Sequence, residues 1–289
     1  MFRTSIIAAT LAITFSAAPA AEVKPIQIKV YNAGDASFNV NSTLVYGQTE
    51  AIVIDAGFTR ADALRIAANV LDSGVKLKTI LVSQADPDYY FGVATLKEFF
   101  PDVQVVATPA VLEKLTAKVN DKLAFWGPKM GANAPKLAVI PTALQGTTLT
   151  VDGQVLEIKG TQGLLAHRPY VWIPSIKTIA GSLGIFGNLH VWTADTQTVA
   201  ERAAWISQLD EMAALHPAVV VPGHMNAGTK LDANSITYTQ NYLRFFETEI
   251  AKTSNSAELI EAMKSAYPNA PVGVALEIGA KVNKGEMKW

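Results

Sequence analysis

Short apolar runs alternate along the chain with amphipathic segments, which is the pattern of an α/β protein. Most of the apolar runs are rich in β-branched residues and are bounded by Gly, Pro, Asn or Asp, so they predict strands. The predicted strands are Ile26–Val30, Ser42–Tyr46, Ala51–Ile54, Thr79–Val82, Val103–Ala107, Leu137–Ile140, Val155–Ile158, Tyr170–Ile173, Thr178–Ala180 and Ala218–Val221.

Capping residues mark the starts of the predicted helices. Capping boxes begin at Thr59 and at Thr198, and Thr108 followed by Pro109 is an N-cap with proline at the first helical position. Further amphipathic helices are predicted at Ser235–Lys252 and Ala257–Ala266, with a last short helix after them. In the helix that begins at Thr59, the apolar face is Leu64, Ala67, Ala68 and Leu71. In the helix that begins at Thr198, it is Trp205, Leu209, Met212 and Ala213.

The order of these elements suggests two similar halves. The first half runs β-β-β-α-β-α-β-α, and the second has several strands followed by a helix, a strand and helices. Two such halves would form a four-layer αββα sandwich in which loops from both sheets meet along one edge. Because no low-complexity tract or Pro/Ser-rich linker divides the halves, we expect a single domain over residues 21–289 with a C-terminal helical extension.

The N-terminus predicts a cleavable signal peptide at residues 1–20. Arg3 supplies a positive charge, Ile6–Phe15 is apolar, and Ala18-Pro19-Ala20 matches the small-residue cleavage pattern, so cleavage is expected near Ala20. The alternative, an N-terminal anchor helix, is disfavoured because the apolar stretch is too short to span a bilayer. We therefore expect a periplasmic or secreted protein with no membrane-spanning segment.

Composition narrows the classes of partner. The formal net charge is −1, without a basic stretch, which argues against a nucleic-acid partner and leaves a small molecule as the expected one. The chain has no cysteine, so neither a disulfide framework nor a thiolate metal ligand is possible. Stability must come from an apolar core, for which 49% hydrophobic residues is ample. The sequence leaves the oligomeric state open.

Three polar segments lie next to apolar strands. Gln84–Gly92 follows one strand, His167 precedes another, and His224 follows a third. Residues at strand ends in open α/β sheets converge on a crevice. Carboxylates together with imidazoles are what a divalent metal ion needs.

These segments resemble the metallo-β-lactamase superfamily, whose fold is also used by glyoxalase II and lactonases. The resemblance covers roughly Ile26 to Thr229 and includes Ile54–Gly57 and Ala180–Ser182. It implies the αββα fold and a hydrolase. In that family a His-x-His-x-Asp-His run, a later His, a bridging Asp and a final His hold one or two zinc ions. A metal-bound hydroxide then attacks an ester, thioester, lactone or β-lactam carbonyl.

The match to this motif is partial. Asp88 keeps the aspartate of the motif, and His167 and His224 fall where the later and the final histidine are expected. The other four positions hold Gln84, Asp86, Tyr89 and Ser182 in place of three histidines and the bridging aspartate.

The resemblance therefore implies a depleted metal centre. Four good ligands, Asp86, Asp88, His167 and His224, could hold a single ion, with Gln84 and Ser182 as weak ligands. Such an oxygen-rich set would accept Zn²⁺, Mn²⁺, Fe²⁺ or Mg²⁺. We expect a mononuclear, weak or absent metal rather than a dinuclear centre.

Simpler interpretations stay open for each residue. Asp-Pro-Asp after a strand is commonly a turn and helix N-cap, and a histidine after Pro-Gly such as His224 is commonly a polar strand-end residue. His167 beside Arg168 could be a solvated loop residue.

Other residues receive supporting roles. Asp88 would be a ligand or general base, Tyr89 could donate to a developing oxyanion, and Asp55 is expected to orient the motif loop through hydrogen bonds. Four side chains are candidates for the wall of an apolar, ring-accepting pocket, with burial in the helix–sheet core as the alternative for the aromatic ones. These are Tyr90, Trp126, His190 and Trp192, of which Trp126 lies in Phe125–Met130, a segment expected in a long stretch between elements.

Two function classes follow. The leading hypothesis is an exported hydrolase that cleaves a small ester, lactone or amide with a metal-activated water. The competing hypothesis is a non-catalytic protein that keeps the fold and binds a small apolar ligand without a metal. The sequence does not choose a substrate, because this fold hosts many chemistries.

Overall fold

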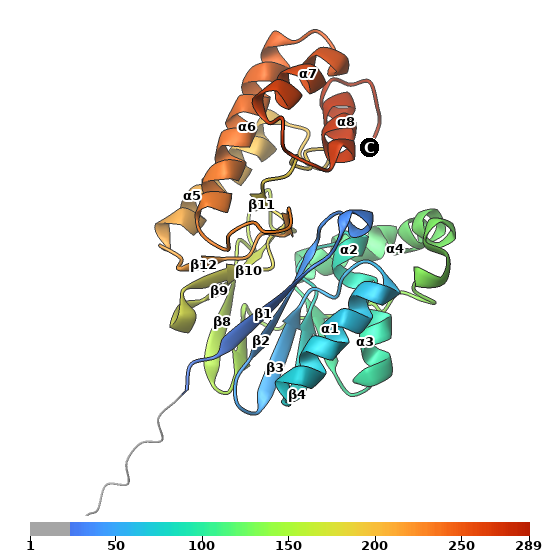
Figure 1. Ribbon diagram of the computed structural model, residues 1–289, viewed down its shortest axis with the longest axis vertical. Coiled ribbons are helices and arrows are strands. Elements are labelled where there is room, and N and C mark those ends of the chain that lie inside the picture. The colour runs from blue at the N-terminus through green and yellow to red at the C-terminus, as the bar shows by residue number, and fades with distance from the viewer. Residues whose placement is uncertain (1–23) are drawn as a thin grey trace, which may run out of the picture.

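Two β-sheets face each other at the centre of the molecule, and helices cover their outer faces (Figure 1). The computed structural model describes residues 24–289, so the predicted signal peptide lies outside the described residues. The first sheet has the order β1-β2-β3-β4-β5-β6 and the second β12-β10-β9-β8-β7, while β11 and β13 form a separate pair. The strands are β1 (Gln27–Asn32), β2 (Asn41–Tyr46), β3 (Glu50–Ile54), β4 (Lys76–Leu81), β5 (Gln104–Ala107), β6 (Thr142–Ala143), β7 (Thr148–Val151), β8 (Gln154–Lys159), β9 (Tyr170–Ile173), β10 (Thr178–Ala180), β11 (Phe186–Gly187), β12 (Val219–Val220) and β13 (His224–Met225).

Helices from the two halves of the chain cover opposite faces of the paired sheets, apart from the C-terminal ones. Helices α1 and α3 cover the first sheet, α5 lies against the second, and α6 to α8 pack together at one end (Figure 1). Their bounds are α1 (Arg60–Ser73), α2 (Pro87–Tyr90), α3 (Val93–Phe99), α4 (Pro109–Met130), α5 (Val199–Ala214), α6 (Asn234–Lys252), α7 (Ser256–Ala266) and α8 (Gly273–Asn283). Within residues 24–289, no helix is both long and apolar enough to cross a lipid bilayer.

The two-residue period of the strands builds the layers. In β3, Ile52 and Ile54 pack between the sheets, whereas Val53 packs against the helices of the first half. In β9, Val171 packs between the sheets and Trp172 packs on the side of α5 and α6. Because successive side chains of a strand point to opposite faces, each central strand contributes to two apolar layers. The αββα sandwich expected from the sequence is confirmed.

Several predicted elements are confirmed closely. Strands β9 and β10 have the predicted bounds, and both capping boxes form, with Thr59 and Thr198 each accepting from the backbone of the third helical residue. Thr108 caps α4 as expected. The C-terminal helices α6 and α7 begin within one residue of their predicted starts.

Three predictions are wrong. Residues 137–140 are not a strand, because β5 pairs with β4 on one side and on the other with the two residues of β6 farther along, and the side chains of Leu137 and Ile140 are exposed. In α1 the side chains of Leu64 and Leu71 are exposed, since Ile66 and Val70 instead turn toward the sheet. Residues 125–130 belong to α4 and not to a stretch between elements.

Candidate functional site

The motif loop begins at the end of β4 and leads directly into α2. Asp86 occupies the N-cap position of α2, but its side chain makes no capping hydrogen bond. Its Oδ1 lies 3.3 Å from Nζ of Lys122 on α4. Asp86 therefore occupies the position that the simpler interpretation gave it, the N-cap, but its side chain does not make the capping hydrogen bond. Its carboxylate is directed to the site.

Asp88 and His224 form a buried pair. Oδ2 of Asp88 lies 3.5 Å from Nε2 of His224, while Nδ1 of His224 lies 2.9 Å from the carbonyl oxygen of Phe38. Because a carbonyl only accepts, Nδ1 carries the hydrogen and donates it, and the lone pair of Nε2 faces Asp88. Phe38 therefore fixes both the tautomer and the orientation of the imidazole.

Burial makes this pair neutral near pH 7. Loss of hydration lowers the pKa of His224 to about 4. Loss of hydration, with the negative charge of Asp86 nearby, raises the pKa of Asp88 to about 8. At neutral pH the imidazole is uncharged and Asp88 is protonated, so the pair can exchange hydrogen bonds with an uncharged ligand.

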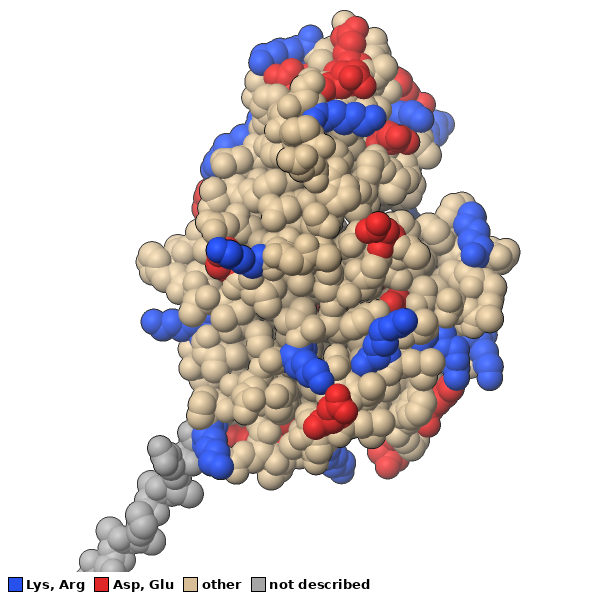
Figure 2. Space-filling view, viewed as in Figure 1, with Lys and Arg blue, Asp and Glu red and all other residues tan. Residues whose placement is uncertain are grey.

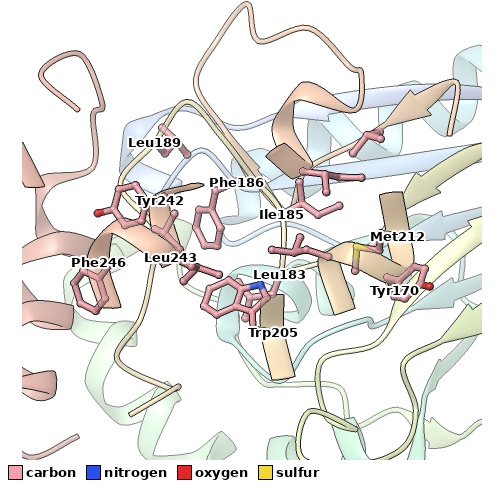
Figure 3. Packing of buried hydrophobic residues seen from close by; sticks show 14 of the residues in the cluster. Tyr170, Leu183, Ile185, Phe186, Leu189, Trp205, Met212, Tyr242, Leu243 and Phe246 are labelled. Atoms are coloured by element: carbon pink, nitrogen blue, oxygen red, sulfur yellow. The ribbon is translucent and has the colours of Figure 1, made fainter. Parts of the chain in front are cut away.

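Aromatic rings hold the imidazole in place. His224 stacks on Phe186, with ring centroids 5.3 Å apart, and meets Tyr89 edge-on at 5.6 Å. Phe186 pairs with His224 because β11 and β13 are neighbours. Phe186 belongs to a cluster of buried apolar side chains that also includes Leu183 and Trp205 (Figure 3).

Asp55 anchors the start of the motif loop. Its carboxylate accepts hydrogen bonds from the backbone nitrogen of Ser83 at 2.8 Å and from the hydroxyl of Ser83 at 2.7 Å. Ser83 directly precedes Gln84, so these bonds agree with the orienting role expected for Asp55. Burial raises the pKa of Asp55 to about 7, although both hydrogen bonds oppose the shift.

The other candidate ligands do not gather around one point. His167 is only half buried and lies beside positive charges of Arg168 and Lys114, which together with burial lower its pKa to about 4. Gln84 is buried, and its Nε2 donates to the carbonyl oxygen of Pro169 at 3.0 Å. Ser182 is fully buried.

These residues do not fit a metal ion. Over residues 24–289, no group of three or more His, Asp or Glu side chains is placed so that it could hold one. Asp88 and His224 are brought together, but Asp86 pairs with Lys122 and His167 stands apart from them. Two protein ligands are fewer than the three that a catalytic zinc site usually has.

A cavity of about 600 Å³ opens in front of Asp88 and His224. It lies between α4 on one side and α8 with the C-terminal residues on the other, where a notch separates the upper and right-hand parts of the molecule (Figure 2). Its walls are mainly aromatic and aliphatic. The aromatic lining is Phe38, Phe58, Phe125, Trp126, Phe186, Trp192 and Trp289.

The predicted pocket residues divide into two groups. Trp126, Trp192 and His190 line the cavity, and Nδ1 of His190 lies 3.1 Å from the hydroxyl of Tyr242. Tyr90 does not line it, because its ring is fully buried in the core between the first sheet and its helices. Tyr89 is also fully buried outside the lining, so its hydroxyl is not placed to meet a cavity ligand.

The sequence did not reveal the wall formed by the C-terminus. Trp192 and Trp289 lie with ring centroids 5.0 Å apart. Their indole nitrogens donate to the same carboxylate, that of Asp195, at 2.5 and 2.8 Å. A tryptophan at the end of an otherwise polar tail is a weak signal for such a contact. A second residue that was missed is Arg168, which is buried although it follows the half-buried His167.

Comparisons with known proteins agree with this fold. The family model of the metallo-beta-lactamase superfamily matches residues 36–224. A solved metallo-beta-lactamase family protein from Thermus thermophilus is 16% identical, with a TM-score of 0.58 over 85% of this chain and 86% of that chain. A metallo-beta-lactamase from Pontibacter korlensis is 18% identical, with a TM-score of 0.52 over 76% of this chain and 99% of that chain. No curated protein matches the chain.

Proposed function

This chain belongs to the metallo-β-lactamase superfamily, and we propose that within this generally hydrolytic family it binds a small, mainly apolar, ring-bearing molecule without a metal ion. The cavity in front of Asp88 and His224 is the observation that carries the proposal. Its size is within the range of small-molecule sites, and its aromatic walls offer flat surfaces for stacking.

The neutral polar groups of the cavity fit a ligand with few charges, and its other lining residues carry both signs, Asp86 and Asp121 together with Lys118 and Lys122. Asp88, His190 and His224 are directed to it, and burial favours the neutral form of all three side chains. They can orient a ligand through one or two hydrogen bonds, while the rings of Trp126 and Trp192 supply most of the contact area.

Binding of the uncharged dye N-phenyl-1-naphthylamine tests the proposal. We expect a saturable rise in fluorescence with one site per chain. Phe125→Ala should weaken binding about tenfold, or about 1.4 kcal/mol, because the ligand covers only part of the exposed ring and complete burial would contribute about 1.5–3 kcal/mol.

Phe99→Ala is the matched control for this experiment. Phe99 and Phe125 are both largely exposed, but only Phe125 lines the cavity. Dye binding that is not saturable, or an equal loss of affinity in both variants, would contradict the proposal.

Hydrolysis of a small ester, lactone or amide is a second candidate, favoured by the Asp88–His224 pair. Nε2 of His224 could accept a proton from water, and protonated Asp88 could donate to the leaving group. The low pKa of His224 makes it a weak base at pH 7, which is why binding comes first.

Turnover of p-nitrophenyl acetate separates the two candidates. Hydrolysis predicts a rate that Asp88→Asn and His224→Gln each abolish while N-phenyl-1-naphthylamine still binds. A rate that is the same in both variants as in the wild type excludes catalysis by this pair.

We also propose that the protein is exported. The charged, apolar and small-residue segments of residues 1–20 support this. Mass spectrometry of the protein recovered from the periplasm or medium should give a chain that begins near Ala21. A full-length chain confined to the cytoplasm would contradict export.

A further inference from the structure

A positively charged side chain is buried next to the motif loop. The side chain of Arg168 is only 2% exposed, and none of its three guanidinium nitrogens has a hydrogen-bond partner among residues 24–289. Its guanidinium lies over the ring of Trp205, 4.3 Å from the centroid. Arginine stays protonated in proteins, so an elementary positive charge is held inside the fold. Because burying an ion without full pairing is costly, such a residue calls for an explanation.

The same interior region holds several neutral acceptors. The side-chain oxygens of Gln84, Tyr89 and Ser182 are buried, and each lacks a partner in the part of the chain that the structure describes. Gln84 is tied to this region because its amide donates to Pro169, the residue after Arg168. Tyr89 lies beside Ser182, because a Cβ atom at Gly223 would lie 2.6 Å from the hydroxyl of Tyr89 and 2.5 Å from the carbonyl oxygen of Ser182.

The surroundings of Gln208 and Gly184 bring Ser182 and Trp205 into the same region as Arg168. Nε2 of Gln208 donates to the carbonyl oxygen of Arg168 at 3.1 Å. A Cβ atom at Gly184 would lie 3.1 Å from Nε1 of Trp205, 3.3 Å from Oγ of Ser182 and 3.5 Å from Oε1 of Gln208. Ser182, Gln208 and the ring under Arg168 thus border one point.

These neighbours include the positions at which the motif lacks its ligands. Gln84, Tyr89 and Ser182 replace two histidines and an aspartate in the resemblance, and the contacts above link all three to the region of Arg168. We propose that Arg168 is the resident cation of this site and takes the place of a metal ion. A fixed positive charge disfavours a divalent cation nearby, and neutral side chains replace the ligands that the metal would have needed.

Metal content measures this directly. Wild type, Gln84→His/Ser182→Asp and Gln84→His/Ser182→Asp/Arg168→Ser are each incubated with Zn²⁺ and dialysed. We expect wild type and the double variant to retain less than about a tenth of an equivalent of zinc, and the triple variant to retain about one equivalent. Zn²⁺ should raise the melting temperature of the triple variant alone, because only a bound metal stabilises the folded state.

Two outcomes would overturn the proposal. One is stoichiometric zinc in the wild type or in the double variant, in which Arg168 is present. The other is a folded triple variant that binds no zinc. If the triple variant does not fold, Arg168→Lys and Arg168→Gln in the double background make the same comparison, and only Arg168→Gln should allow zinc to bind. None of these measurements uses a cavity ligand, so their result is independent of the proposed binding function.

Discussion

Burial governs the ionisation of the acidic side chains at the site. Asp55 and Asp88 are both buried, and loss of hydration raises the pKa of each. Asp55 differs because its carboxylate accepts two hydrogen bonds from Ser83, whereas Asp88 faces the imidazole of His224 and the charge of Asp86. This makes Asp55 the clearest residue on which to test the electrostatics of the site.

Asp55→Asn should change how stability depends on pH. The pKa of Asp55 is raised to about 7 in the folded state, so its contribution to stability is complete below its unfolded value near 4 and is lost as pH rises through 7. Asparagine keeps an acceptor for Ser83 and tolerates the left-handed backbone, with φ of 66°. We expect the variant to gain stability relative to wild type between pH 5 and pH 8, measured by urea unfolding.

Asp55→Ala is the companion variant. It removes both hydrogen bonds and places alanine at a positive φ, so it should be about 2–4 kcal/mol less stable than Asp55→Asn at every pH, because neither variant titrates at this position. If the stabilities of wild type and Asp55→Asn run parallel from pH 5 to pH 8, Asp55 does not titrate in that range.

At the scale of elements, the motif loop is held against the end of β3 by close backbone packing. Gly92 joins α2 to α3, and its backbone nitrogen donates to the carbonyl oxygen of Gly57 at 3.0 Å. The backbone nitrogen of Ala56 in turn donates to the carbonyl oxygen of Tyr89 at 2.8 Å. These contacts connect the segment after β3 to the helix that carries Asp88.

Gly92→Ala should loosen this connection. A Cβ atom at position 92 would lie 2.0 Å from the carbonyl oxygen of Ala56, so the backbone must move apart. We expect a loss of about 3 kcal/mol in the free energy of unfolding, at the upper end of overpacking costs, together with weaker binding of N-phenyl-1-naphthylamine.

Gly34→Ala is the control for this substitution. A Cβ atom at Gly34 meets no atom within 4 Å, and its backbone is extended, so the change should be within about 0.5 kcal/mol. Equal stabilities of the two variants would show that the segment after β3 does not constrain the motif loop.

At the scale of the whole molecule, the cavity depends on how the C-terminal helices dock. Arg202 of α5 is buried and donates to the carbonyl oxygen of Thr196 at 3.0 Å and to Asn283 of α8 at 2.7 Å, and it also pairs with Glu247 of α6. One side chain thus links three helices. This link is distant from Asp88. It still contributes to the surroundings of Asp88, because α8 forms a wall of the cavity that Asp88 lines.

Arg202→Leu should therefore affect both stability and ligand binding. Removing the guanidinium leaves Glu247 and Asn283 without their partner, at a cost of about 3 kcal/mol. We expect a lower melting temperature, faster amide exchange in α8 and weaker dye binding.

Arg244→Leu is the matched control. Arg244 is exposed and lies 3.8 Å from Asp210, so its loss should cost less than about 1 kcal/mol and leave dye binding unchanged. Unaltered dye binding and exchange in Arg202→Leu would show that α8 docks independently of this link.

Much of the architecture follows from local patterns. The bounds of β9, the caps at Thr59 and Thr198 and the helices of the tail were all predicted, because side-chain periodicity and capping act over a few residues. The pairing of Asp88 with His224 could be expected from their places at strand ends. The strand predicted at 137–140 failed because an apolar run does not reveal whether a neighbouring strand is there to pair with it.

The sequence by itself determined the layers, the position of the motif loop and the absence of the usual ligand residues at four positions, Gln84, Asp86, Tyr89 and Ser182. Only the tertiary structure decided which of the adjacent residues His167 and Arg168 is buried. The second is buried because Trp205, from a helix far along the chain, supplies a surface for its guanidinium. The cavity also depends on distant segments, since its opposite walls come from α4 and α8. Local sequence specifies each wall, but the space between the walls exists only once long-range packing has fixed their separation.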